Sequence, residues 1–397
     1  MINKIYNFHD LLYIQLKGKN GDFIKYCETE FSHAKQIKNE DKKENVQQII
    51  LSLKENITTE GTVWALGKGL FYNKKNDIIL ISENNSLFFN PSDIYASVPN
   101  IFEHLNQNLK VDVKLKLNKN NKIENIMRKL FDIIFKIDPR TKDEIFAEKF
   151  ISEFIEPLIY RSFLQKGYLL LHAAGLVKNN IGILVFGSQN IGKTTITLGM
   201  SKRGWYVLGD DMCLLDKNGN LKSYTKPIKL ENEYLRTDRF AQNYFFSDKL
   251  KNKPLRLQYY KLMNKKIKRF EFKIPTYKMG IKTTCFSKID CIIFLQRKSE
   301  IECDKAVTIE SISSQDSTTL AQQYIADEFD ANKRVDRDIR HAMAIYKRYS
   351  GDFSLLTSKA KSIIKEAFKN KTSYILTMTK PDASTLDDIE DIKNSLT

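Results

Sequence analysis

A glycine loop between an expected strand and an expected helix constrains this chain more than any other feature. The loop, Gly-Ser-Gln-Asn-Ile-Gly-Lys-Thr from Gly187 to Thr194, matches the pattern G-x-x-x-x-G-K-[ST]. The apolar run 181–186 before it predicts a strand, and residues 194–202 after it predict a helix. Such a loop curls backbone N–H groups around phosphate oxygens at the positive end of a helix. The sequence therefore predicts an α/β fold with a phosphate-binding site.

Each part of this loop has an expected role. Lys193 should reach the terminal phosphates of a nucleotide, and the Thr194 hydroxyl should ligate Mg²⁺. The alternative is an ordinary glycine-containing turn, which the flanking strand and helix disfavour. The residues that we expect to bind the nucleotide are Gly187, Ser188, Gln189, Asn190, Ile191, Gly192, Lys193, Thr194 and Thr195.

A pair of acids follows the next expected strand, Trp205 to Leu208, after Gly209. The short helix before this strand allows a right-handed crossover to an adjacent parallel strand, whose carboxyl end would lie beside the loop. Asp210 and Asp211 should then organise the metal at that edge. The alternative is an acidic pair that only begins a turn.

An antiparallel hairpin is expected just upstream of the loop. Lys178-Asn179-Asn180 reads as a tight turn between two apolar strands. A turn centred between Asn179 and Asn180 sets a register that places His172 opposite Gly187. A role for His172 at the site and a role as a core histidine are about equally well supported.

These residues together carry a resemblance. The segment LLLHAAGLV-KNN-IGILVFGSQNIGKTTITLGMSKRGWYVLGDDMCLL, within residues 168–216, resembles the catalytic core of HPr kinase/phosphorylase. It is more similar still to the HPr kinase-like proteins encoded with peptide-modification gene clusters, such as those for lasso peptides. That family shares its phosphate-loop core with phosphoenolpyruvate carboxykinases. Weaker similarity extends to YTKPIKL (224–230) and to the strand that ends in Arg297.

The resemblance implies roles for individual residues. It makes Gly187, Gly192 and Lys193 the phosphate cradle and Thr194 a magnesium ligand. It makes Asp210 and Asp211 the metal-organising acid and the general base, without saying which is which. His172 matches a histidine beside the phosphate site. The Glu-Ile-Arg-Gly signature of true HPr kinases is missing here, and Thr194 stands where most of them have Ser, so we expect a substrate other than HPr.

Two basic features could assist the reaction. Arg297 is a candidate for the arginine that stabilises charge during transfer, and a surface ion pair is its alternative. The segment from Lys249 to Arg269 contains basic residues, no acidic one, and the pair Tyr259 and Tyr260. It could clamp an acidic substrate, be a solvated loop, or bind nucleic acid, which we rank last because no RNA-binding signature accompanies it.

Composition and pattern suggest how the chain is organised. Short β-like runs at 12–16, 48–53, 78–82 and 87–90 predict a β-rich accessory domain over residues 1–120. We expect a helical connector over 121–166 and the catalytic domain over 167–380. The acidic tail over 381–397 should be a solvated helix or a loose segment outside the core. The five cysteines form no CxxC pair, which argues against a disulfide framework or a zinc site.

Charge and hydropathy limit the partners. A net charge of +16 favours acidic or phosphorylated partners. The chain has no apolar run long enough for a membrane span and no signal-peptide pattern, so we expect a cytoplasmic protein without membrane contact. Oligomeric state is left open, including a homo-oligomer.

We therefore predict a kinase that uses ATP and Mg²⁺ to phosphorylate a Ser/Thr-type hydroxyl of a peptide or protein. Two alternatives stay open at this point. One is a kinase of a small metabolite or carbohydrate, because the acceptor pocket has no readable motif. The other is a non-catalytic nucleotide-binding module that recognises a peptide.

Overall fold

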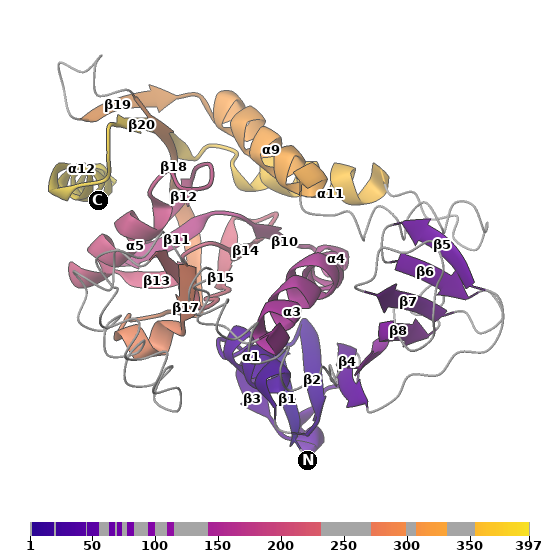
Figure 1. The fold of residues 1–397 in the computed structure, drawn as a ribbon. Coiled ribbons are helices and arrows are strands. Elements are labelled where there is room, and N and C mark those ends of the chain that lie inside the picture. The colour runs from indigo at the N-terminus through magenta and orange to yellow at the C-terminus, as the bar shows by residue number, and fades with distance from the viewer. Residues whose placement is uncertain are drawn as a thin grey trace.

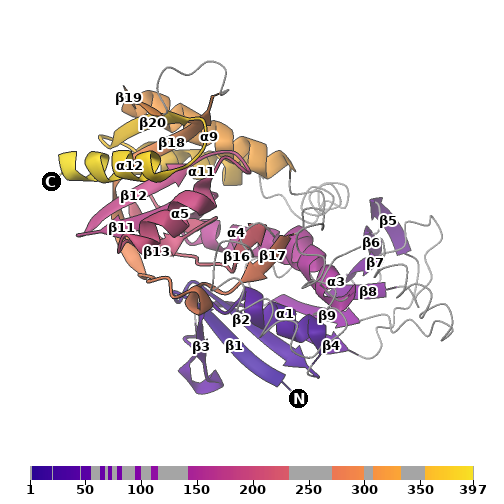
Figure 2. The same cartoon turned by 60° about the vertical axis from the view of Figure 1, so that its left-hand side comes forward.

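A computed structural model describes residues 2–19, 21–44, 46–54, 63–67, 70–73, 78–82, 94–99, 109–114, 142–231, 271–298, 307–331 and 354–396. These residues form a mixed α/β protein with several sheets (Figures 1 and 2). Within them, no helix combines the length and the apolar character that crossing a lipid bilayer requires. The expected strand at 87–90 and the basic segment 249–269 lie outside the described residues.

The amino-terminal part is built on a sheet of strand order β3-β1-β2-β4-β9-β8-β7-β6-β5. Strands β2, β4 and β9 run parallel to one another, and β5 to β8 form an antiparallel meander that Figure 1 shows to one side of β1–β3. Three of the expected strands are present, as β2, β4 and β7. The bounds are β1 Ile2–Phe8, β2 Leu12–Gly18, β3 Lys35–Ile37, β4 Gln47–Lys54, β5 Val63–Gly67, β6 Leu70–Asn73, β7 Ile78–Ser82, β8 Ile94–Pro99 and β9 Leu109–Lys114.

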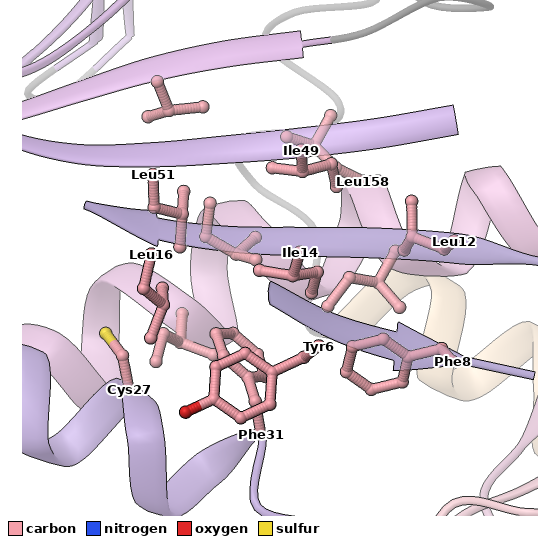
Figure 3. Packing of buried hydrophobic residues seen from close by; sticks show 14 of the residues in the cluster. Tyr6, Phe8, Leu12, Ile14, Leu16, Cys27, Phe31, Ile49, Leu51 and Leu158 are labelled. Atoms are coloured by element: carbon pink, nitrogen blue, oxygen red, sulfur yellow. The ribbon is translucent and has the colours of Figure 1, made fainter. Parts of the chain in front are cut away.

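Alternation along the strands builds the core beneath this sheet. Leu12, Ile14 and Leu16 lie on one face of β2 because side chains in a strand alternate between faces, and they pack in one cluster with Ile49 and Leu51 of β4 (Figure 3). Three helices complete the cluster: α1 (Asp22–Glu30), α3 (Lys142–Phe150) and α4 (Glu156–Gln165). A π-helical turn, Ile151–Ile155, joins α3 to α4. The described part of the expected connector is therefore helical.

The carboxy-terminal part has a sheet of order β10-β14-β15-β18-β12-β11-β13, with β20 beside β18 and β19 beside β20. A separate strand pair is formed by β16 (Ile228–Glu231) and β17 (Glu271–Ile274). The strands of the larger sheet are β10 Tyr168–Leu171, β11 Ala174–Lys178, β12 Ile181–Phe186, β13 Tyr206–Gly209, β14 Cys213–Asp216, β15 Asn220–Ser223, β18 Phe286–Arg297, β19 Val307–Ile312 and β20 Thr372–Met378. The helices are α5 Lys193–Lys202, α9 Ser314–Ala331, α11 Ser354–Ala367 and α12 Ala383–Ser395.

Helices cover both faces of this sheet at β12 and β18. Leu184 and Phe186 of β12 pack in a cluster with side chains of α9 and α11. Ile183 and Val185 of the same strand pack in the opposite cluster with side chains of α5 and α12. Because both faces of β12 are covered, its whole length is apolar and buried, as the uninterrupted sequence IGILVF indicates.

The predicted hairpin register is confirmed between β11 and β12, although the pairing does not extend to His172 and Gly187. Asn179 and Asn180 form the two-residue turn, with φ of 52° and 64°, so that Lys178 pairs with Ile181 and Ala174 with Val185. Asparagine tolerates this left-handed backbone conformation better than most residues, and two such residues in succession suit a tight hairpin.

Two details of the expected sheet were wrong. The apolar run before the turn is not one strand, because β10 pairs with β14, β11 pairs with β12, and His172 lies in the break between them. Strand β13 is also not adjacent to β12, because β11 lies between them and pairs with both. The crossover through α5 therefore spans one strand of the sheet.

The acidic carboxy-terminal segment forms a helix that belongs to the core, which corrects the expectation of a solvated helix or loose tail. Residues 383–395 form α12, whose Ile389 and Ile392 are buried against α5 in the core cluster. Its acidic residues lie on the remaining surface of the helix or pair with basic groups. The many acidic residues of this segment suggested full exposure, but Ile389 and Ile392 form an apolar stripe at helical spacing.

Candidate functional site

The loop from Gly187 to Thr194 connects the end of β12 to the start of α5. Its tight path depends on two glycines, since a Cβ on Gly187 would lie 2.6 Å from Ile191 Cγ2, and Gly192 has φ of +123°. Ser188, Gln189 and Asn190 are exposed at the tip, whereas Ile191 is buried beneath it. The loop is therefore held by the buried side chain of Ile191, and its polar tip is accessible to solvent.

Lys193 begins α5 and is only 6% exposed. Its Nζ donates hydrogen bonds to the carbonyl oxygens of Gly187, at 2.5 Å, and of Ser188, at 3.3 Å. Burial lowers the pKa of Lys193, while Asp211 and Asp210 act in the opposite direction. The ammonium is therefore placed inside the curve of the loop, where an anion would meet it.

Thr194 and Asp210 join the loop to the end of β13. The Thr194 hydroxyl donates a 2.9 Å hydrogen bond to Asp210 Oδ2. The other carboxylate oxygen, Oδ1, is buried and has no hydrogen-bond partner among the described residues. Burial, reinforced by the charge of Asp211, raises the pKa of Asp210 to about 6. A buried carboxylate oxygen without a donor is costly, so this atom is suited to receive a cation.

Asp211 points to a different partner. Its Oδ1 lies 2.7 Å from His172 Nε2, and the two side chains are 53% and 25% exposed respectively. Desolvation acts to raise the pKa of Asp211, but the hydrogen bond and charge of His172, with Lys226 and Lys193, outweigh it and hold the pKa below its usual value. The two neighbouring acids therefore differ sharply: Asp210 is buried against the loop, and Asp211 is accessible and paired with histidine.

The donors present fit a magnesium ion that also binds phosphate. Mg²⁺ is commonly held by one or two carboxylates together with substrate phosphates and water, rather than by a complete protein cage. Asp210 Oδ1 and the Thr194 hydroxyl are such oxygen donors beside the start of α5. The described residues contain no cluster of three or more His, Cys, Asp or Glu side chains that could hold a metal by themselves. The phosphates would thus have to supply part of the coordination.

The structure brings together most of the residues that the sequence singled out. They lie around one loop and come from three places: the start of α5 (Lys193 and Thr194), the end of β13 (Asp210 and Asp211) and the break between β10 and β11 (His172). Thr195 is exposed on the first turn of α5. Arg297 is exposed at the end of β18, which runs parallel to β12 and so ends at the same edge of the sheet.

Sequence reasoning missed Lys226, whose charge acts on Asp211. Lys226 interacts electrostatically with Asp211 and forms ion pairs with Glu30 and Glu156 from the amino-terminal part of the chain. Lys226 lies in the stretch YTKPIKL, which was noted only for its similarity. The residues that neighbour Lys226 in the sequence do not indicate that it pairs with Glu30 and Glu156, which lie far away in the chain.

Comparison with known proteins adds little to this geometry. No protein-family model and no curated protein matches the chain. Among solved structures, the chain is similar to the HPr(Ser) kinase/phosphatase from Coxiella burnetii, with 12% sequence identity and a TM-score of 0.26. The alignment covers 57% of this chain and 94% of that one. With a likeness this weak, functional conclusions depend on the chain's own side chains.

Proposed function

We propose that this protein is an ATP- and Mg²⁺-dependent phosphotransferase that acts on a Ser/Thr-type hydroxyl of a peptide or protein. The observation that carries the proposal is the contact between Thr194 and Asp210, with the unpartnered Asp210 Oδ1 beside the buried ammonium of Lys193. A positive group at the start of a helix, with a cation-binding carboxylate nearby, is what a bound nucleoside triphosphate requires.

The two acids would divide the work. Asp210 and Thr194 would hold Mg²⁺, which when bound neutralises charge on the phosphates. Asp211 is accessible and stays ionised, so it can accept a hydrogen bond from an acceptor hydroxyl. A carboxylate whose pKa is low is a weak base, so its main contribution would be to orient the hydroxyl, with His172 fixing its position.

The exposure of Asp211 favours a large acceptor. Its side chain is 53% exposed, so the place where the hydroxyl would bind is open to solvent. An enclosed pocket would instead suit a small metabolite, which an enzyme must surround to bind. The accessible carboxylate is the feature that supports a peptide or protein acceptor.

Binding and transfer can be tested separately. Calorimetry with MgATP on the parent and on Lys193→Ala should show loss of binding in the variant, because the β and γ phosphates lose their buried cation. Lys202→Ala, at the opposite end of α5, is the matched control and should bind as the parent does. Undiminished binding by Lys193→Ala would contradict the proposal.

Radiolabelled γ-phosphate then identifies the acceptor. Transfer to Ser/Thr-containing peptides, and not to sugars or nucleosides, is the expected result. Transfer to a sugar or nucleoside would make the protein a metabolite kinase. Tight MgATP binding without any transfer would instead indicate a nucleotide-binding recognition module.

A further inference from the structure

A buried carboxylate of the amino-terminal part lies at the boundary with the catalytic part. Glu30 ends α1 and is 3% exposed. Its two oxygens face two lysines from the carboxy-terminal part, Lys226 at 3.4 Å and Lys273 at 3.0 Å. Burial acts to raise the pKa of Glu30, but these two lysines outweigh it and lower the pKa. Glu30 is therefore a buried anion that needs both cations.

Each lysine is shared with a second acid of the amino-terminal part. Lys226 also pairs with Glu156, the first residue of α4, and Lys273 also pairs with Glu148 of α3 at 3.6 Å. Lys226 precedes β16 and Lys273 lies within β17, and Figure 2 shows this strand pair between α4 and α1. The cluster thus has an internal symmetry: two lysines, each bridging Glu30 and one other glutamate.

Lys226 is connected to the candidate site through the backbone that precedes it. The backbone before Lys226 lies against the end of β13, since Tyr224 N–H donates to Leu208 O at 2.9 Å and a Cβ on Gly209 would lie 3.3 Å from Tyr224 O. Gly209 immediately precedes the acidic pair. Burial acts to lower the pKa of Lys226, but Glu156, Glu30, Tyr224 and Asp211 together raise it well above its usual value.

We propose that Lys226 is a positioning residue through which the amino-terminal part acts on the site: Glu30 and Glu156 hold its ammonium near Asp211, where its charge favours binding of the nucleotide's phosphates. This inference rests on the proposed function. The physical reason is that a charge held in a partly desolvated position acts over several ångströms with little screening. Without Lys226, Glu156 would lose this partner and Glu30 would keep only Lys273, so the remaining negative charge would disfavour an anion nearby.

Lys273 provides a matched control. It is 21% exposed against 13% for Lys226, it pairs with the same Glu30, and it bridges to a second glutamate in the same way. Lys273 lies within β17 opposite Lys229 of β16, whereas the backbone before Lys226 lies against β13. Removing either lysine changes net charge equally and breaks the same kind of interface pair.

The experiment compares Lys226→Met with Lys273→Met in the full chain, measuring the melting temperature and the MgATP dissociation constant. We expect similar losses of melting temperature, but a MgATP affinity reduced by about tenfold or more in Lys226→Met alone. Lys226→Arg, which keeps the charge, should restore most of the affinity. If the single variants do not fold, Lys226→Met/Glu30→Gln and Lys273→Met/Glu30→Gln remove one charge of each sign and leave fewer carboxylates stranded.

The outcomes separate this inference from the proposed function. Equal MgATP affinity in the two methionine variants would overturn the role of Lys226 and leave the proposed function intact. Equal affinity in Lys226→Arg and Lys226→Met would overturn it as well, because charge would then be irrelevant. A parent protein that binds no MgATP would overturn both, and the measurement on the parent shows this before any variant is compared.

Discussion

Pro381 lies directly against Gly192 of the loop. A Cβ atom on Gly192 would lie 2.6 Å from Pro381 Cγ. The φ angle of Gly192 is +123°, a backbone conformation that residues with a side chain rarely adopt. Pro381 follows β20 and precedes α12, so the carboxy-terminal segment packs on the same loop that begins α5. The conformation of the loop is therefore set partly by a residue far from it in sequence.

The first prediction concerns this contact. Gly192→Ala should destabilise the fold by backbone strain, about 1–3 kcal/mol, and by the clash with Pro381, and it should weaken MgATP binding. Gly204→Ala is the control, because Gly204 has φ of +87° but nothing within 4 Å of a built Cβ. In Gly192→Ala/Pro381→Ala the clash is removed, so the double variant should be less destabilised than the sum of the singles. Urea unfolding measures all four variants, and additive effects would contradict the contact.

The second prediction concerns the pH dependence of Asp210. Its pKa is raised from 3.8 to about 6, so the native state keeps this proton at pH values where the unfolded state has lost it. The stability contributed by this group is therefore present at low pH and is lost as pH rises through about 6, by on the order of 3 kcal/mol.

Asp210→Asn should remove this loss. Compared with the parent, the variant should be more stable at about pH 8 and of similar stability at about pH 4, where the parent carries a neutral side chain of the same shape. Chemical unfolding at both pH values checks the sign. The same variant should lose Mg²⁺-dependent ATP binding, and a variant less stable than the parent at about pH 8 would argue against a penalised carboxylate.

The third prediction concerns the pair of His172 with Asp211. His172→Gln should reduce phosphoryl transfer by at least about tenfold, because the acceptor-orienting carboxylate loses its fixed partner. Its melting temperature should change little, since exposed pairs contribute little to stability. Single-turnover rates on His172→Gln, Asp211→Asn and the double variant should be non-additive. A lower melting temperature with full activity of the folded fraction would instead make His172 a structural residue.

The fourth prediction concerns the attachment of α12. Glu390 Oε1 accepts hydrogen bonds from Trp205 Nε1 at 2.7 Å and from Lys178 Nζ at 2.8 Å. Trp205 is fully buried, so Glu390→Ala should leave the indole N–H of Trp205 without an acceptor. This should lower the free energy of unfolding by about 1–3 kcal/mol. Asp387→Ala, which breaks an ion pair with Arg203 in which Asp387 is 68% exposed, should cost less than about 1 kcal/mol. Thermal unfolding compares them, and similar losses in both would contradict a special role for Glu390.

The sequence alone determined the features that depend on neighbouring residues. The loop pattern, its flanking strand and helix, and the hairpin register at Asn179 and Asn180 follow from backbone preferences within a few positions, and the structure contains each of them. The expected position of Asp210 at the edge beside the loop agrees with its contact with Thr194, although the expected adjacency of β12 and β13 was wrong.

Only the tertiary structure decided what depends on residues far apart in the chain. The insertion of β11 between β12 and β13, the packing of α12 and Pro381 on α5 and its loop, and the attachment of Lys226 to Glu30 all join segments separated by long stretches of sequence. Local patterns carry no record of such partners, since an acidic helix or a lone lysine looks the same whether it faces water or a buried opposite charge. Whether such a residue faces water or a buried partner is decided by packing and charge compensation in the folded chain. Both depend on many residues of the core at once.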